Sequence, residues 1–261
     1  MITAASNSRI KRLVQLNQKS KLRRTEDVFL AEGVKMFLEA PREQLQEVYV
    51  SESFLEKCSC REHLEEVGYE VVSDIVFSKI SDTCTPQGVL CVLKQFHYNI
   101  EEMLRDKAPL FLLLENIQDP GNLGTMLRTG EGAGVSGIIM SRDTVDLYNP
   151  KVIRSTMGSI YRVPFYYADD FAEAVHQVQQ AGVSVYAAHL RGKNSYACQD
   201  YTKGTAFLIG NEGNGLREET AELADCYIRI PMEGKVESLN AAVASSILMY
   251  EAHRQRATIE K

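Results

Sequence analysis

The chain has 261 residues and a mass of 29.3 kDa, and 44% of its residues are hydrophobic and 25% are charged. This composition is typical of a globular protein with a substantial core and excludes collagen-like, mucin-like and disordered chains. The longest apolar runs are far shorter than the roughly 20 residues of a membrane helix, and the first residues lack the apolar stretch of a signal peptide. We therefore expect a cytoplasmic protein with no membrane partner.

Basic residues are concentrated in the first 24 positions. The formal net charge of the chain is −6, but residues 1–24 carry +7 and contain no acid, which leaves −13 for the other 237 residues. The basic residues are Arg9, Lys11, Arg12, Lys19, Lys21, Arg23 and Arg24. Ile10, Leu13 and Leu16 recur among them at helical spacing, which predicts an amphipathic helix. Its cations have two interpretations that stay open, a solvated face and a contact with a polyanion.

The segment from Glu47 to Lys94 alternates short β-rich runs with helical stretches. Strands are predicted at 47–51, 69–72 and 88–94, with helices at 53–68 and 74–81, which indicates a compact α/β unit. Residues 95–109 then read as a linker that contains a short helix. We place the boundary between residues 95 and 108, which divides the chain into 1–97 with a basic arm at 1–24, a linker at 98–108, and 109–261.

The six cysteines include no CxxC pair, so a disulfide framework is not expected. Cys84, Cys91 and Cys226 lie in or beside apolar segments and are expected to be reduced core residues. The cluster formed by Cys58, Cys60 and His63 offers three ligands without a second pair. We interpret it as a helix surface and expect no metal.

A second alternation of strands and helices follows the linker. Near-continuous apolar strands are predicted at 110–115, 137–141, 164–168, 183–189, 205–210 and 226–230. Helical segments such as 171–182 separate them, which predicts a parallel sheet covered on both faces.

Polar side chains follow the strand at 110–115, at the edge where open α/β sheets bind ligands. Asp119 is suited to cap a helix with Pro120 in its first turn, which is a structural role. Asn122 and Arg128 have no such role, and an arginine in an otherwise small and apolar helix suits a fixed contact with an anion or a polar substrate.

A GxGxxG pattern occurs at Gly132, Gly134 and Gly137. These glycines follow a helical stretch and precede a strand, whereas a dinucleotide fingerprint follows a strand and opens a helix. We therefore interpret Gly134 as a helix C-cap and disfavour a nucleotide-dependent oxidoreductase.

Two further polar blocks follow strands of the same predicted sheet. After the strand at 205–210, three glycines surround Glu212 and allow a ligand to approach the backbone, but a phosphate-binding P-loop is excluded because no Lys and Ser/Thr follow them. After the strand at 226–230, Ser238 is predicted as the N-cap of a long helix. The apolar face expected for that helix comprises Leu239, Val243, Ile247 and Tyr250.

In this order the three blocks resemble the motifs of the SpoU (TrmH-type) branch of the SPOUT RNA methyltransferases. The matching segments are NIQDPGNLGTMLR at 116–128, FLIGNEGNGL at 207–216 and IPMEGKVESLNAAVASSI at 230–247. The resemblance spans roughly residues 108–256. The front part, with FLAEGVKMFLEA at 29–40, is similar to the small α/β RNA-binding domain that often precedes the catalytic domain.

The resemblance implies an α/β fold class: a C-terminal trefoil-knotted SPOUT domain with a parallel sheet, preceded by a small ribosomal-protein-like domain that binds the RNA substrate. It also implies a homodimer and S-adenosylmethionine held in the knot by backbone groups. The family's catalytic residues fall on Asn122, Arg128, Glu212, Ser238 and Asn240. Its cofactor contacts fall on Gly210, Ile230 and Leu239, largely through the main chain.

The expected function is therefore S-adenosylmethionine-dependent 2′-O-ribose methylation of structured RNA, with ribosomal RNA favoured because a separate front domain is present. Transfer RNA as the substrate, and an inactive RNA-binding factor in ribosome assembly, stay as alternatives. Arg128 either activates the 2′-hydroxyl or fixes a phosphate and stabilises the developing oxyanion. Glu212 either orients Arg128 or Asn122, or accepts the proton.

Overall fold

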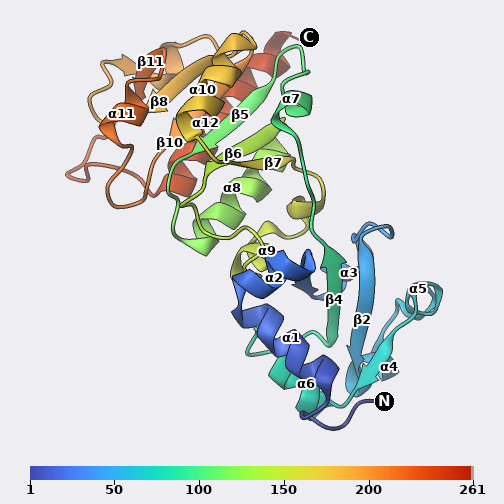
Figure 1. Ribbon diagram of the computed structural model, residues 1–261. Coiled ribbons are helices and arrows are strands. Elements are labelled where there is room, and N and C mark those ends of the chain that lie inside the picture. The colour runs from blue at the N-terminus through green and yellow to red at the C-terminus, as the bar shows by residue number, and fades with distance from the viewer. Residues whose placement is uncertain (260–261) are drawn as a thin grey trace. The chain divides into compact units, whose positions relative to one another are not determined.

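The computed structural model describes residues 1–259 and divides into two compact units (Figure 1). Unit 1 comprises Met1–Phe96 together with Asp146–Tyr161, and unit 2 comprises His97–Val145 and the chain from Arg162 onward. Among residues 1–259, none of the helices combines the length and the apolar character that crossing a bilayer requires.

Unit 1 is built around a four-stranded mixed sheet with the strand order β1-β4-β2-β3. Strand β4 runs antiparallel to both β1 and β2, and β3 runs parallel to β2. The strands are β1 (Val28–Glu32), β2 (Leu45–Ser51), β3 (Glu70–Val72) and β4 (Val89–Lys94). The helices are α1 (Ser8–Gln18), α2 (Ser20–Glu26), α3 (Val34–Leu38), α4 (Glu52–Lys57), α5 (Arg61–Val67), α6 (Asp74–Ile80) and α9 (Pro150–Thr156), with a 3-10 turn η1 (Ser159–Tyr161).

Helix α1 packs onto this sheet through the apolar positions that its sequence predicts. Ile10, Leu13 and Leu16 are each 0% exposed, and they join one core cluster with Leu30 and Tyr49 of the strands. The predicted amphipathic helix is therefore confirmed, and it is part of the folded unit 1.

Residues 146–161 lie far from the front of the sequence but belong to unit 1. Helix α9 packs against β1, and the Tyr148 hydroxyl donates to the Phe96 carbonyl at 3.1 Å. The Tyr161 hydroxyl donates to the Met36 carbonyl at 3.0 Å. No sequence pattern predicts this insertion, and the division into 1–97, 98–108 and 109–261 stays a prediction.

Unit 2 contains a seven-stranded sheet with the order β7-β6-β5-β10-β8-β11-β9, in which every strand pair is parallel. This confirms the predicted parallel sheet. The strands are β5 (Leu110–Leu114), β6 (Gly137–Ser141), β7 (Phe165–Ala168), β8 (Ser184–Ala188), β9 (Asn194–Ser195), β10 (Thr205–Ile209) and β11 (Cys226–Arg229). The helices are α7 (Ile100–Met103), α8 (Pro120–Ala133), α10 (Phe171–Gln180), α11 (Glu218–Ala221) and α12 (Ala241–Ile259), with a 3-10 turn η2 (Tyr196–Cys198).

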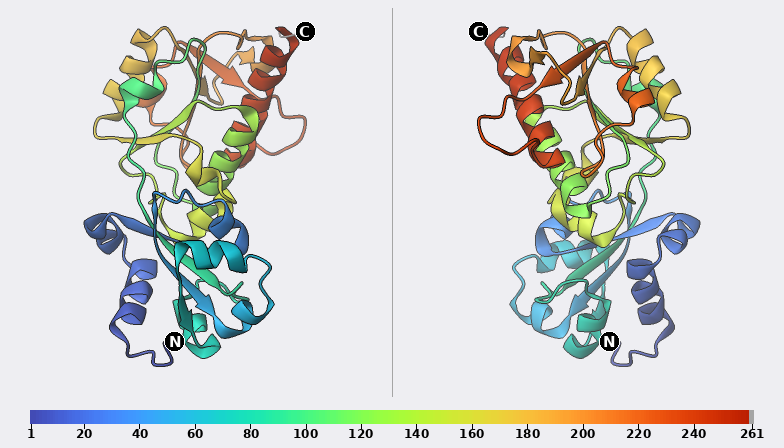
Figure 2. Two further views of the ribbon diagram at one scale, coloured as in Figure 1. Left: turned by 90° about the vertical axis from the view of Figure 1, so that its right-hand side faces the viewer. Right: turned by 90° about the vertical axis from the view of Figure 1, so that its left-hand side faces the viewer.

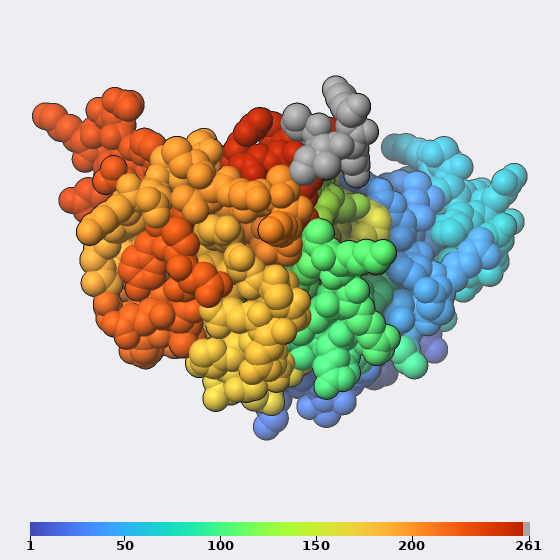
Figure 3. All heavy atoms as spheres, turned by 90° about the horizontal axis from the view of Figure 1, so that it is seen from above, coloured from blue at the N-terminus to red at the C-terminus, as the bar shows by residue number. Residues whose placement is uncertain are grey.

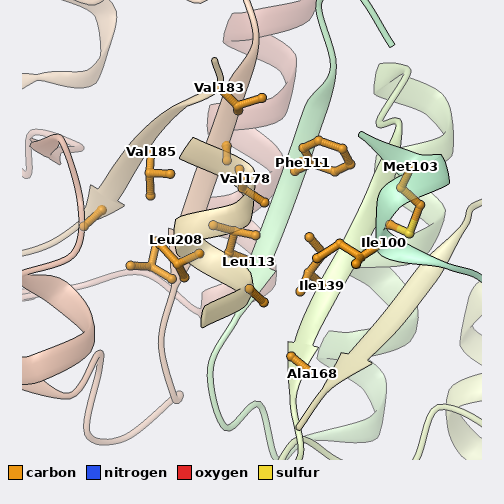
Figure 4. Packing of buried hydrophobic residues seen from close by; sticks show 14 of the residues in the cluster. Ile100, Met103, Phe111, Leu113, Ile139, Ala168, Val178, Val183, Val185 and Leu208 are labelled. Carbon is orange, nitrogen blue, oxygen red and sulfur yellow. The ribbon is translucent and has the colours of Figure 1, made fainter. Parts of the chain in front are cut away.

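Apolar residues cover both faces of the unit 2 sheet. On one face Phe111 and Leu113 of β5 pack with Val178 of α10 and with Met103 of α7 (Figure 4). On the other face α12 packs against β5 and β10 and lies alongside α8 (Figure 1, Figure 2). Because successive strand residues point to opposite faces, alternate residues of one apolar strand fill two cores.

Two local expectations, one about a helix and one about the cysteines, are wrong. The helix predicted at 53–68 is broken into α4 and α5, with Cys58 as the C-cap of the first and Cys60 as the N-cap of the second. Cys91 is buried as predicted, but Cys84 is exposed and Cys226 is only half-buried. Within residues 1–259 there is no cluster of His, Cys, Asp and Glu side chains suited to a metal ion.

Candidate active site

The three motif segments meet where neighbouring strands of the unit 2 sheet end. Strands β5 and β10 are paired in register, with Leu114 opposite Ile209. The chain leaves β5 through Glu115, whose N–H donates to the Ile209 carbonyl at 2.9 Å. The first and second motifs therefore start side by side, as the carboxyl ends of adjacent parallel strands must.

Helix α8 begins as its sequence predicts. The Asp119 carboxylate accepts the backbone N–H of Asn122 at 2.7 Å, and Pro120 occupies the first turn. The helix ends at Ala133 and its C-cap is Gly134, which adopts the left-handed conformation with φ of 78°. Both capping predictions are confirmed.

Glu212 lies across the start of α8 and receives three hydrogen bonds. Its Oε1 accepts the Asp119 N–H and the Asn122 side-chain amide, both at 3.0 Å. Its Oε2 accepts the Gln118 N–H at 3.1 Å. Partial burial raises the pKa of this carboxyl, but the three donors lower it by more, so the pKa lies below its ordinary value and Glu212 is ionised at neutral pH.

Asn122 connects Glu212 to the third motif. Its Oδ1 accepts the side-chain amide of Asn240 at 2.9 Å. The Oδ1 of Asn240 in turn accepts the N–H groups of Ala242 and Val243, at 2.9 and 3.2 Å. A continuous chain of hydrogen bonds therefore runs from Glu212 through Asn122 and Asn240 to the N-terminus of α12, and we call this chain the relay.

The relay corrects the prediction for the start of the last helix. Ser238 was expected to be its N-cap, but α12 begins at Ala241 and Asn240 provides the cap. Both residue types cap helices well, and Asn240 is held in place because its amide also binds Asn122.

The loop of the second motif is a tight turn closed on the backbone. Asn211 and Gly215 exchange main-chain hydrogen bonds at 3.0 and 2.9 Å, and Gly215 has φ of 70°. A Cβ atom on Gly210 would lie 2.2 Å from the backbone nitrogen of Leu216. A side chain at Gly210 is therefore excluded, and backbone groups line this part of the loop.

The same loop is fastened at its far end by a buried carboxylate. Glu115 is 1% exposed, and its Oε2 accepts the Arg217 N–H at 2.8 Å. Its Oε1 accepts the Thr220 hydroxyl at 2.5 Å, and the Arg217 guanidinium also pairs with Asp143. Glu115 ends the strand predicted at 110–115, and no sequence pattern indicates this role for it.

The remaining predicted site residues make fewer contacts. The guanidinium of Arg128 and the hydroxyl of Ser238 are exposed, and neither has a hydrogen bond or ion pair to any residue of 1–259. Gly210, Ile230 and Leu239 are half-buried at the ends of β10 and β11 and before α12. The loop at 230–240 stands out from the rest of unit 2 (Figure 2, Figure 3).

An open depression of about 640 Å³ lies over the relay. Its lining residues are Gln118, Asp119, Pro120, Asn122, Asn211, Glu212, Gly213 and Asn240. Of the predicted site residues, the structure thus brings Asn122, Glu212 and Asn240 into direct contact and leaves Arg128 and Ser238 unbonded.

Two family models match this chain. Residues 109–250 match the SpoU rRNA Methylase family, and residues 7–91 match the MRM3-like substrate binding domain. The first match covers unit 2 except for its two ends, and it contains all of the relay.

Individual proteins are similar over nearly the whole chain. The 23S rRNA (guanosine(2553)-2'-O)-methyltransferase RlmP of Bacillus subtilis (strain 168) is 32% identical over 252 residues, which cover 95% of this chain and 97% of the relative. The structure of an AdoMet-bound rRNA methyltransferase from Sinorhizobium meliloti is 31% identical, with a TM-score of 0.83 and 97% of each chain covered. The SpoU methyltransferase AviRb from Streptomyces viridochromogenes, in complex with AdoMet, is 27% identical with a TM-score of 0.87, covering 97% of this chain and 99% of the other. The family-model match over residues 109–250 and the similarity to RlmP over nearly the whole chain show that the chain belongs to the SpoU rRNA methylase family.

Proposed function

We propose that this protein transfers the methyl group of S-adenosylmethionine to the 2′-hydroxyl of a ribose in ribosomal RNA. The observation that carries the proposal is the relay that joins Glu212, Asn122 and Asn240 at the carboxyl edge of a parallel sheet. Its three members come from the three motifs of the family. The 23S rRNA specificity stated for the relative from Bacillus subtilis, which matches both halves of the chain, favours ribosomal RNA.

Gly210 follows β10 directly, at the carboxyl edge of the sheet, where open α/β sheets bind ligands. The main chain of Gly215 and Leu216 occupies the place that a Cβ atom of Gly210 would take, so peptide groups and not a side chain form this part of the site. We infer that main-chain groups of Gly210, Ile230 and Leu239 hold S-adenosylmethionine. When bound, this cofactor supplies an electrophilic methyl group attached to a sulfonium.

Asn122, Glu212 and Asn240 act as positioning residues in this proposal. Glu212 is a weak base because its pKa is lowered and both oxygens already accept hydrogen bonds. It is therefore better suited to fix the start of α8 than to accept the proton of the 2′-hydroxyl. Asn240 fixes the N-terminus of α12 against the same point.

Arg128 is the residue of α8 that remains available to the substrate. Its guanidinium is exposed and has no partner among residues 1–259, so binding an anion costs no existing ion pair. Since arginine is effectively always protonated, we infer that it fixes a phosphate of the RNA and stabilises the oxyanion that forms at the ribose. Ser238 is exposed in the loop before α12 and offers a further hydroxyl to the RNA.

The assembly we propose is a homodimer. Val243 and Tyr250 of α12 are each 49% exposed, and they were expected to be part of a packed apolar face. The Tyr250 hydroxyl lies near Gly132 of α8, within 3.0 Å of the position that a Cβ atom would take there. Because Val243 and Tyr250 lie seven residues apart on one face of α12, and exposed apolar side chains that share a face favour association, we infer that a second copy covers this face.

Family membership also supports a trefoil knot at the carboxyl edge of the sheet. We further infer a role in rRNA processing in the cytoplasm, without a metal ion.

The proposed function is tested with purified protein, methyl-labelled S-adenosylmethionine, and transcripts of 23S ribosomal RNA and of transfer RNA. The expected result is label in ribosomal RNA that co-elutes with a 2′-O-methylnucleoside after nuclease digestion. Label in transfer RNA alone would overturn the choice of substrate, and label on a base would overturn the chemistry.

A further inference from the structure

Charge is divided unevenly within unit 1. Residues 1–24 contain seven basic and no acidic side chains, whereas residues 42–70 contain eight carboxylates and three basic side chains. The first segment forms α1 and most of α2, and the second forms β2, α4 and α5. A polyanion therefore meets attraction on one part of this unit and repulsion on the other.

Two of the seven cations are already neutralised by carboxylates. Arg9 pairs with Glu70 at 2.7 Å. Arg12 pairs with Glu26 at 2.7 Å and with Glu47 at 2.8 Å. A phosphate that bound these arginines would have to displace an existing partner.

A third cation is buried and structural. Arg23 is 3% exposed, and its guanidinium donates to the Leu16 carbonyl at 2.6 Å and to the Asn17 carbonyl at 3.2 Å. It also pairs with Asp146 at 2.5 Å. Arg23 therefore fastens α2 to α1 and to the inserted segment, and it is not available to a ligand.

The other four cations are free. Lys11, Lys19, Lys21 and Arg24 are exposed, and none has a side-chain hydrogen bond or ion pair within the described part of the chain. We call them the α1–α2 cations.

Three of the α1–α2 cations lie on the outer side of their helices, and Lys19 lies between α1 and α2. Lys11 is on the side of α1 that faces away from the buried Leu13 and Leu16. Lys21 and Arg24 are three residues apart on α2 and so share one face. Because residues 1–25 contain no carboxylate, nothing within this segment cancels their charge.

We propose that the α1–α2 cations form the surface on which the phosphate backbone of the substrate RNA docks. This inference rests on the proposed function and adds which face of unit 1 the RNA contacts. The segment at 42–70 is the less favourable choice, since it carries eight carboxylates and only three basic side chains, and four of those carboxylates are paired with arginines. The surface recognises charge rather than base sequence, because lysine and arginine ends reach phosphates without reading base edges.

The number of free cations sets the expected salt dependence. Four phosphate contacts, at about 0.7–0.9 released counterions each, give a slope of log affinity against log salt of about −3. Affinity should then fall about 60-fold between 50 and 200 mM monovalent salt. If all seven cations bound phosphates, the slope would be about −5 to −6.

The test compares two full-length variants that each lose four positive charges. The first replaces the α1–α2 cations: Lys11→Gln, Lys19→Gln, Lys21→Gln and Arg24→Gln. The matched control replaces four exposed basic residues elsewhere in unit 1: Lys35→Gln, Arg42→Gln, Lys57→Gln and Arg61→Gln. Binding of a fluorescent RNA hairpin is measured across the same salt range, alongside thermal unfolding and S-adenosylmethionine affinity.

The first variant should bind the hairpin at least tenfold more weakly at 50 mM salt, with a slope of about −1 or shallower, and should keep the wild-type unfolding temperature and cofactor affinity. The control should keep a slope near −3. A wild-type slope in the first variant, or equal losses in both, would overturn the proposed surface. Methyl transfer by the wild-type protein is scored separately, so a failure of the proposed function is distinguished from a failure of the surface.

Discussion

Replacing Glu115 by alanine tests whether the buried carboxylate fastens the second-motif loop. Glu115 is 1% exposed and accepts the Arg217 N–H at 2.8 Å and the Thr220 hydroxyl at 2.5 Å. Glu115→Ala removes both acceptors and leaves a cavity. Each stranded donor costs about 1–3 kcal/mol. We therefore expect the free energy of unfolding to fall by about 3–5 kcal/mol, the range for breaking a buried charged contact.

Glu115→Gln is the matched control because it keeps the shape of the side chain. Its remaining oxygen can accept the Arg217 N–H, and its amide can donate to the Thr220 hydroxyl, which also has acceptor capacity. The carboxylate charge is lost, so we expect about 1 kcal/mol of destabilisation, the net contribution of one ordinary hydrogen bond.

Urea unfolding measures both variants, and calorimetric titration measures their affinity for S-adenosylmethionine. Loosening the loop that follows Gly210 should weaken cofactor binding in Glu115→Ala by more than tenfold, while Glu115→Gln should stay within a few-fold of wild type. A Glu115→Ala variant whose free energy of unfolding lies within about 1 kcal/mol of wild type, and which binds the cofactor with unchanged affinity, would show that Glu115 does not hold the loop.

Three further predictions concern chemistry, assembly and pH. Arg128→Ala should slow methyl transfer by about 100-fold or more, the cost of losing one oxyanion donor, with unchanged cofactor affinity and unfolding temperature; steady-state kinetics within tenfold of wild type would contradict this role. Light scattering should give about twice 29.3 kDa for the wild type and a single-chain mass for the double variant Val243→Asp, Tyr250→Asp, whereas a monomeric wild type would contradict the dimer. The pKa of Glu212 is lowered in the folded protein, so the ionised carboxyl stabilises the fold. This stabilisation is complete above about pH 4.5 and is lost as the pH falls through the pKa that Glu212 has in the folded state. The stability difference between wild type and Glu212→Gln in urea should therefore shrink from pH 6 to pH 3, and a constant difference would refute the assignment.

The parts of the fold that the sequence predicted are those encoded locally. Asp119 followed by Pro120 specifies a helix start within four residues, and the structure places the cap there. Continuous apolar runs such as 110–114 predicted buried parallel strands, because strands covered on both faces need no polar side. The motif resemblance located the relay residues, although it gave none of the contacts among them.

The errors arise where a partner distant in sequence decides between local options. Ser238 and Asn240 are both competent caps, and the choice depends on Asn122, which is 118 positions away from Asn240. In the sequence Arg23 is one cation of a basic run, but in the structure it is buried and pairs with Asp146, which lies 123 positions later.

The stripe that includes Val243 correctly indicated a helix but was wrong about the buried face, because Leu248, Met249 and Ala252 pack into unit 2 while Val243 and Tyr250 are exposed. Glu115 shows the same limit, because its acceptor role depends on Arg217, 102 positions away.

The central claim is that the relay-centred site methylates ribose in ribosomal RNA, and the most direct measurement is mass spectrometry of ribosomal RNA treated with the purified protein. Ribosomal RNA from a strain that lacks the gene should gain one 2′-O-methylnucleoside with the wild-type protein and S-adenosylmethionine. It should gain none with Arg128→Ala, although that variant binds the cofactor. Bound cofactor without any transferred methyl in the wild-type reaction, or an equal gain with Arg128→Ala, would contradict the account.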